Sequence, residues 1–135
     1  MEERTRERPL AGFNLVAVAG TEGLCLHFDG TLRAVPFGAG AHVISSDGDL
    51  DDPSLPEKQR FDRLLAAGPG LPGIAGIRGF LSSHETPRPV CKHGDAFGTV
   101  SSTLLLRTDR GDLLHHVQGA PCSAPFPEPI RFNVP

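Results

Sequence analysis

The sequence predicts an α+β fold with largely antiparallel sheets and one or two helices. Two observations carry this prediction: strand-like segments joined by hairpin turns fill the first and last thirds of the chain, and helical patterns occupy the middle. A third observation, 16 glycines and 13 prolines among 135 residues, predicts long loops between the elements. No apolar run approaches the roughly 18 residues that a membrane-spanning helix needs.

The first third of the chain predicts a three-stranded meander. Residues 13–19, FNLVAVA, form a compact apolar run that is typical of a buried strand. Residues 24–28 alternate between apolar and polar side chains, and Asp29-Gly30 then favours a hairpin. Residues 31–35 return as the partner strand, which we expect Pro36 to end. A further short strand is expected around residues 42–45.

Two helices are predicted in the middle of the chain. Ser54-Leu55-Pro56-Glu57 is a capping-box pattern with a proline early in the first turn, and Gly68 is a typical helix end. The apolar spacing of residues 74–81 predicts a second, short helix.

The last third predicts one hairpin and an irregular tail. Residues 99–107 have a strand pattern, Asp109-Arg110-Gly111 is a tight turn, and residues 112–118 return. Four prolines between residues 121 and 129 predict an irregular ending. The expected organisation is a charged arm over residues 1–9, a single half-domain over residues 10–120 and a proline-rich tail over residues 121–135.

Charge and cysteine content narrow the class of protein. Thirteen basic against sixteen acidic residues give a net charge of −3, and no one-signed basic stripe is present, so we expect no nucleic-acid partner. Three cysteines without a CxxC pair indicate free thiols in a reducing cytosol rather than a disulfide scaffold.

Local motifs for catalysis or metal binding are weak. Cys91-x-His93 and His115-His116 contain metal-ligand residue types, but the regular spacing of a zinc site is missing, and adjacent strand histidines point to opposite faces. We therefore assign no metal ligand and no cofactor, and expect one of the paired histidines to face solvent and the other to be semi-buried. A serine nucleophile lacks a GxSxG motif, and the glycines at 94 and 98 lack the rest of a phosphate-binding loop.

Several segments, in order along residues 10–117, resemble a known family. They are Gly12-Phe13-Asn14-Leu15, residues 40–46 (GAHVISS), the helix opening at residues 53–58, Val90-Cys91-Lys92-His93 and residues 97–105 (FGTVSSTLL). Together they are similar to the second half of the NRDE family, which includes the transport and Golgi organisation protein 2 homologues.

The resemblance implies part of an N-terminal-nucleophile-hydrolase-like (αββα) fold, with two stacked sheets between helical layers. The family's presumed nucleophile is a cysteine after the initiator methionine, whereas this sequence has Glu2 and contains no Asn-Arg-Asp-Glu motif. The expectation is a truncated protein that is not catalytic by itself, because a nucleophile mechanism needs its attacking group. The implied partners are an upstream half-protein or a second copy, and an apolar, acyl or haem ligand, since the family is linked to haem and lipid or acyl-CoA homeostasis.

The family reading predicts that five residues line one ligand cleft: Asn14, Ser46, His93, Thr99 and Ser101. Two alternatives remain open at this point. One is a non-catalytic interaction module that pairs through exposed sheet edges. The other is a small metal-dependent enzyme that uses Cys91, His93 and His115.

Overall fold

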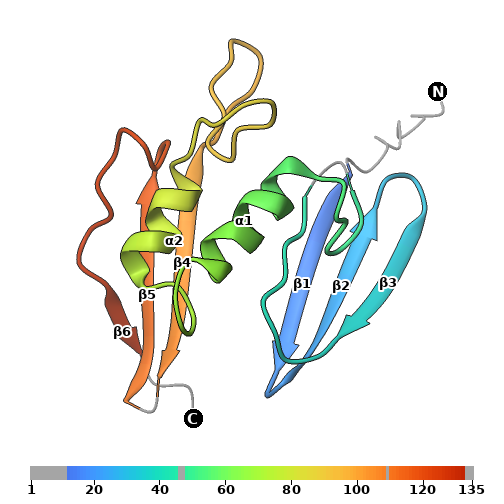
Figure 1. Cartoon of the computed structure of the whole chain (residues 1–135), viewed down its shortest axis with the longest axis horizontal. Coiled ribbons are helices and arrows are strands. Elements are labelled where there is room, and N and C mark those ends of the chain that lie inside the picture. The colour runs from blue at the N-terminus through green and yellow to red at the C-terminus, as the bar shows by residue number, and fades with distance from the viewer. Residues whose placement is uncertain (1–11, 46–47, 109, 133–135) are drawn as a thin grey trace, which may run out of the picture. The chain divides into compact units, whose positions relative to one another are not determined.

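The computed structural model describes residues 12–45, 48–108 and 110–132, and contains two antiparallel three-stranded sheets and two helices (Figure 1). The α+β class and the antiparallel pairing are thus confirmed. Contacts divide the chain into two compact units, Met1–Lys58 and Gln59–Pro135. Residues 1–9, expected to form a charged arm, lie outside the described residues.

The N-terminal unit contains the expected meander. Strands β1 (Phe13–Ala19), β2 (Glu22–Phe28) and β3 (Leu32–Phe37) lie in the order β1-β2-β3, each antiparallel to its neighbour. Contrary to expectation, Pro36 does not end β3 but lies within it, opposite Leu24. Because β3 is an edge strand, a residue without an N–H donor is tolerated there.

The register gives this sheet one almost entirely apolar face. Directly opposed residues of antiparallel strands share a face, so the side chains group in rows across the sheet. One side of the sheet carries only apolar residues at nine positions, and we call it the apolar face. Its residues are Phe13, Leu15 and Ala17 of β1, Leu24, Leu26 and Phe28 of β2, and Leu32, Ala34 and Pro36 of β3. One charged residue, Glu22, stands at its end, opposite Ala19.

The prediction that residues 13–19 form a buried strand is wrong about burial. The strand forms, but every residue in it except the half-buried Asn14 is exposed. Apart from this sheet, the described part of the N-terminal unit supplies only loops and the first turn of a helix, which is too little to cover both sides of a sheet. On the opposite face Cys25 of the central strand is buried, whereas Val16, Val18 and Val35 of the outer strands are exposed.

The short strand expected around residues 42–45 is also absent. The amide of Val43 donates to Oδ1 of Asp51 at 2.8 Å, and its carbonyl accepts from the Asp51 amide at 2.9 Å. These bonds use the backbone groups that a sheet partner would need, so the segment is a closed loop.

The helices follow the sequence pattern. Helix α1 (Pro56–Ala66) begins at the proline of the capping-box pattern, and α2 (Ile74–Leu81) covers the predicted range.

The C-terminal unit contains the second sheet, in the order β4-β5-β6. Its strands are β4 (Ser101–Thr108), β5 (Gly111–Gln118) and β6 (Ile130–Phe132). The tail was expected to be irregular, but β6 pairs with β5 directly after Pro129, where the chain regains its N–H donors.

Candidate functional site

The five residues predicted to line one cleft are distributed over both units. Asn14 belongs to β1 of the N-terminal unit, whereas His93, Thr99 and Ser101 belong to the C-terminal unit. Ser46 lies outside the described residues. Thr99 has a local role, because its Oγ1 accepts a hydrogen bond from the Lys92 amide at 2.9 Å, and Ser101 is exposed at the start of β4.

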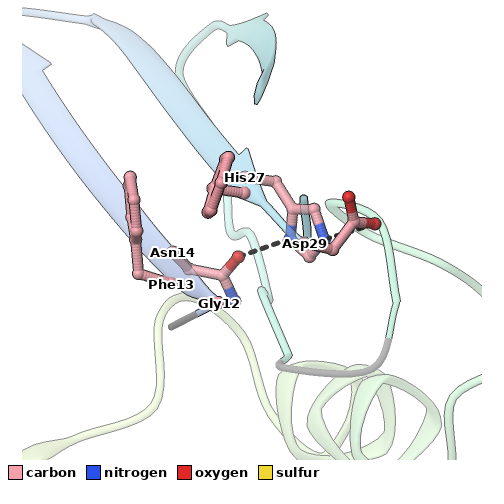
Figure 2. A pocket seen from close by; sticks show the side chains of 6 residues that line it. Gly12, Phe13, Asn14, His27 and Asp29 are labelled. Atoms are coloured by element: carbon pink, nitrogen blue, oxygen red, sulfur yellow. Dashed lines mark hydrogen bonds and ion pairs between the residues drawn. The ribbon is translucent and has the colours of Figure 1, made fainter. Parts of the chain in front are cut away.

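Asn14 lines a small pocket at one end of the first sheet, in which polar side chains stand beside the apolar rings of Phe13 and Phe28. The pocket measures about 270 Å³ and is lined by Gly12, which precedes β1, by residues of β1 and β2, and by the turn that follows β2 (Figure 2). Oδ1 of Asn14 lies 2.5 Å from Nδ1 of His27, and Nδ2 of Asn14 donates to the Ser45 carbonyl at 3.0 Å. Nε2 of His27 lies 3.5 Å from Oδ2 of Asp29.

The chemistry of this pocket is limited. A hydrogen bond from the Thr31 amide is the main cause that lowers the pKa of Asp29, so the carboxylate is charged near neutral pH. The titratable side chains of the pocket are those of His27 and Asp29, and the lining includes no Ser, Thr, Cys or Lys. The pocket is also smaller than the roughly 300 Å³ of most ligand sites.

The C-terminal unit holds a cluster of cysteine and histidine side chains that the sequence only partly indicated. One ligand-type atom from each of His84, Cys91, His93 and Cys122 lies within 4.8 Å of all the others. Nε2 of His93 lies 3.1 Å from Nε2 of His84, 3.1 Å from Sγ of Cys122 and 3.7 Å from Sγ of Cys91. We call these four residues the Cys/His cluster.

The cluster is assembled from two loops. His84, Cys91 and His93 belong to the connection between α2 and β4, and Cys122 belongs to a turn after β5. The amide of Cys91 donates to the Ser83 carbonyl at 3.0 Å, which brings the two ends of the 84–91 segment together. Oγ of Ser82 donates to the Pro121 carbonyl at 3.1 Å, which fixes the turn that carries Cys122 beside the end of α2.

Burial differs within the Cys/His cluster. Cys91 is only 1% exposed and forms its base, whereas the other three residues are exposed. Burial, and after it the hydrogen bond with Cys122, raises the pKa of the Cys91 thiol. The buried thiol is therefore protonated near neutral pH when no cation is bound.

His115 does not join this cluster, although it was grouped with Cys91 and His93 in the metal-dependent alternative. It is buried on β5, where its Nδ1 lies 2.9 Å from Nη2 of Arg78. The neighbouring His116 is exposed and its Nδ1 lies 2.8 Å from Oγ1 of Thr103. One of the two histidines faces solvent, as expected, while the other, which we expected to be semi-buried, is fully buried.

No local pattern in the sequence indicated His84 and Cys122 as members of the Cys/His cluster. Cys91-x-His93 was recognisable, but Cys122 lies 29 residues beyond His93 and His84 nine residues before it, which matches no regular zinc spacing. Only the tertiary fold brings these residues together.

Comparison with protein-family models, curated proteins and solved structures finds no match for this chain. Among the residues that the structure describes, no helix has the length and apolar character needed to cross a membrane.

Proposed function

We propose that this chain is a non-catalytic interaction module, related to the NRDE family, that binds a second copy of itself through the apolar face of the β1–β3 sheet. The observation that carries the proposal is the row-by-row apolar composition of that face. Four of its large side chains are exposed: Phe13, Leu15, Leu24 and Leu32. A contiguous apolar surface of this kind marks an interaction site in a folded protein.

A second copy is the occupant that the chemistry of the face favours. Within its nine defining positions the face has no charged group that would require an opposite charge on a partner. It is therefore complementary to itself, as a two-fold symmetric interface requires. Two sheets stacked through such faces form an apolar layer about 10 Å thick, the arrangement expected of a fold with two stacked sheets.

As part of the same proposal, the chain acts in the cytosol. Its three cysteines are not paired in disulfides, which suits a reducing compartment.

Sedimentation velocity of the purified chain over a wide range of concentrations tests the proposal. The structure offers a matched pair of variants, because Leu32 is 60% exposed on the apolar face and Val18 is 59% exposed on the opposite face. We expect a concentration-dependent dimer that Leu32→Lys weakens by roughly 100-fold, since a lysine would be buried without a partner. Val18→Lys should change the dimer constant only a few-fold.

Two outcomes would overturn the proposal. One is a native chain that stays monomeric at all concentrations, which would leave the face to a different partner or to a ligand. The other is an equal effect of the two lysine variants, which would show that the apolar face is not the contact.

A further inference from the structure

We propose that the Cys/His cluster of the C-terminal unit is a tetrahedral zinc site with the ligands His84, Cys91, His93 and Cys122. Two thiolates and two imidazoles are a ligand set that selects Zn²⁺ among the common divalent ions. The site is separate from the proposed docking face, which belongs to the other unit of the chain. The two proposals therefore stand or fall independently.

The distances fit a common central ion. Bonds of about 2.3 Å to sulfur and 2.0–2.1 Å to nitrogen in a tetrahedron place neighbouring ligand atoms about 3.3–3.8 Å apart. The three separations measured from Nε2 of His93 are 3.1, 3.1 and 3.7 Å. All four ligand atoms lie within 4.8 Å of one another, so small side-chain adjustments suffice to surround an ion.

The hydrogen-bonding capacity of His93 gives a second argument. Its Nε2 approaches three polar atoms, those of His84, Cys91 and Cys122. A neutral ring nitrogen carries either one hydrogen or one lone pair, so it can complete only one of these contacts well. A cation at the centre satisfies all four groups at once, because each then directs a lone pair to the same point.

Hydrogen bonds of the surrounding backbone hold the ligand residues in place before an ion binds. The Ser83–Cys91 and Ser82–Pro121 hydrogen bonds hold the two loops that carry the ligands. The Thr99 amide donates to the Lys92 carbonyl at 2.9 Å, and the Lys92 amide donates to Oγ1 of Thr99, so the residue between Cys91 and His93 is fixed on both sides. Preorganised ligands reduce the entropy lost when the ion binds.

Four protein ligands leave no open position, so the site is structural rather than catalytic. Binding releases one proton from each thiol: Zn²⁺ replaces two protons, and the two thiolates neutralise the charge of the ion. The bound ion joins the 84–93 loop to the turn at Cys122. We therefore expect it to stabilise the connection between α2 and β4 and the segment after β5.

The test uses the full-length chain, reduced and then freed of metal by a chelator. Titration with Co²⁺, followed by absorption spectroscopy, reports both stoichiometry and geometry, and competition with Zn²⁺ gives the zinc affinity. We expect one ion per chain, a tetrahedral spectrum with thiolate charge-transfer bands, and displacement by Zn²⁺.

Ligand variants distinguish this site from adventitious binding. Cys122→Ser and His84→Asn alter exposed residues, so both variants should fold, which far-UV circular dichroism checks. Each should weaken Zn²⁺ binding by roughly 100-fold, because one of four ligands is lost. The matched controls are His116→Asn, an exposed histidine on β5, and Cys25→Ala, a cysteine of the other unit, and neither should change the affinity by more than a few-fold.

The proposal is overturned if the reduced chain takes up no Co²⁺ or Zn²⁺ in one-to-one ratio. It is equally overturned if Cys122→Ser and His84→Asn bind as tightly as the native chain. An octahedral cobalt spectrum without charge-transfer bands would also contradict it, because thiolates would then not be ligands.

Discussion

Nδ1 of His42 lies 2.6 Å from Oδ2 of Asp51, and Nε2 of the same ring lies 3.0 Å from the Gly38 carbonyl. Both ring nitrogens thus face acceptors, which only the imidazolium form can satisfy with two N–H donors. The hydrogen bond to Asp51 is the main cause that raises the pKa of His42. Burial alone would raise the pKa of Asp51, but the bonds from His42 and the Val43 amide outweigh it and lower that pKa.

This pair predicts a pH window of greatest stability for the N-terminal unit. The His42 contribution is fully present below its unfolded pKa of about 6.5 and is lost as the pH rises through the raised folded value. The Asp51 contribution is present above its unfolded pKa of about 3.9 and is lost as the pH falls through the lowered folded value. The His42–Asp51 pair therefore stabilises the folded chain most between the two unfolded pKa values, about 3.9 and about 6.5. Urea unfolding at a series of pH values measures the effect.

The variant Asp51→Asn isolates the charge of this pair. Asparagine tolerates the positive φ of 58° at position 51 and still offers an oxygen to the Val43 amide. We expect a loss of about 1 kcal/mol near pH 6, a modest value because both side chains are partly exposed. The loss should shrink above the folded pKa of His42. A loss that is equal at all pH values would contradict the ionic origin of the effect.

Gly23 leads to a second prediction, on the packing of the first sheet. The ring of Phe37 lies directly over Gly23, its partner across β2 and β3, so a Cβ atom at position 23 would collide with it. The same ring packs against His42 with the centroids 4.8 Å apart. We expect Gly23→Ala to displace this ring and to destabilise the chain by about 1–3 kcal/mol.

The control is Gly38→Ala, because no atom lies within 4 Å of a Cβ built there. It should leave the free energy of unfolding nearly unchanged or raise it slightly. Urea unfolding of both variants decides the point. Equal stability of Gly23→Ala and the native chain would mean that Phe37 has room to move and is not held over Gly23.

Local patterns were sufficient to predict most elements of this fold. The alternation at residues 24–28, the turn at Asp29-Gly30 and the capping pattern before α1 each depend on near neighbours in the chain, and the corresponding elements form. Burial was less predictable, because an apolar run such as residues 13–19 shows only that its side chains need to be packed against another part of the protein. Whether another layer supplies that packing is decided by the rest of the fold.

The candidate sites could likewise be predicted only where their residues are close together in the sequence. Cys91 and His93 are two residues apart and could be recognised together, whereas His84 and Cys122 join them only through the Ser83 and Pro121 backbone contacts. The sequence likewise placed Asn14 at a site but did not indicate His27 as its partner. That pairing follows from the register of β1 and β2, in which the two residues stand opposite each other.

The three cysteines differ in environment, which leads to a prediction for their chemical reactivity. Cys25 is 2% exposed, Cys91 is 1% exposed, and burial raises the pKa of both thiols, so they react slowly as nucleophiles. Cys122 is exposed. In the folded, reduced chain with a chelator present, iodoacetamide should therefore modify Cys122 at least about tenfold faster than the other two, because the reagent reaches an exposed sulfur more readily than a buried one.

Peptide mass spectrometry after timed alkylation measures the three rates separately. Adding Zn²⁺ in place of the chelator should slow the modification of Cys122 and leave that of Cys25 unchanged, since a metal-bound thiolate is a poor nucleophile and Cys25 lies outside the Cys/His cluster. Rapid modification of Cys25 in the absence of metal would show that the face opposite the apolar face of the β1–β3 sheet becomes accessible to the reagent in solution. Unchanged reactivity of Cys122 with Zn²⁺ would remove this cysteine from the set of ligands.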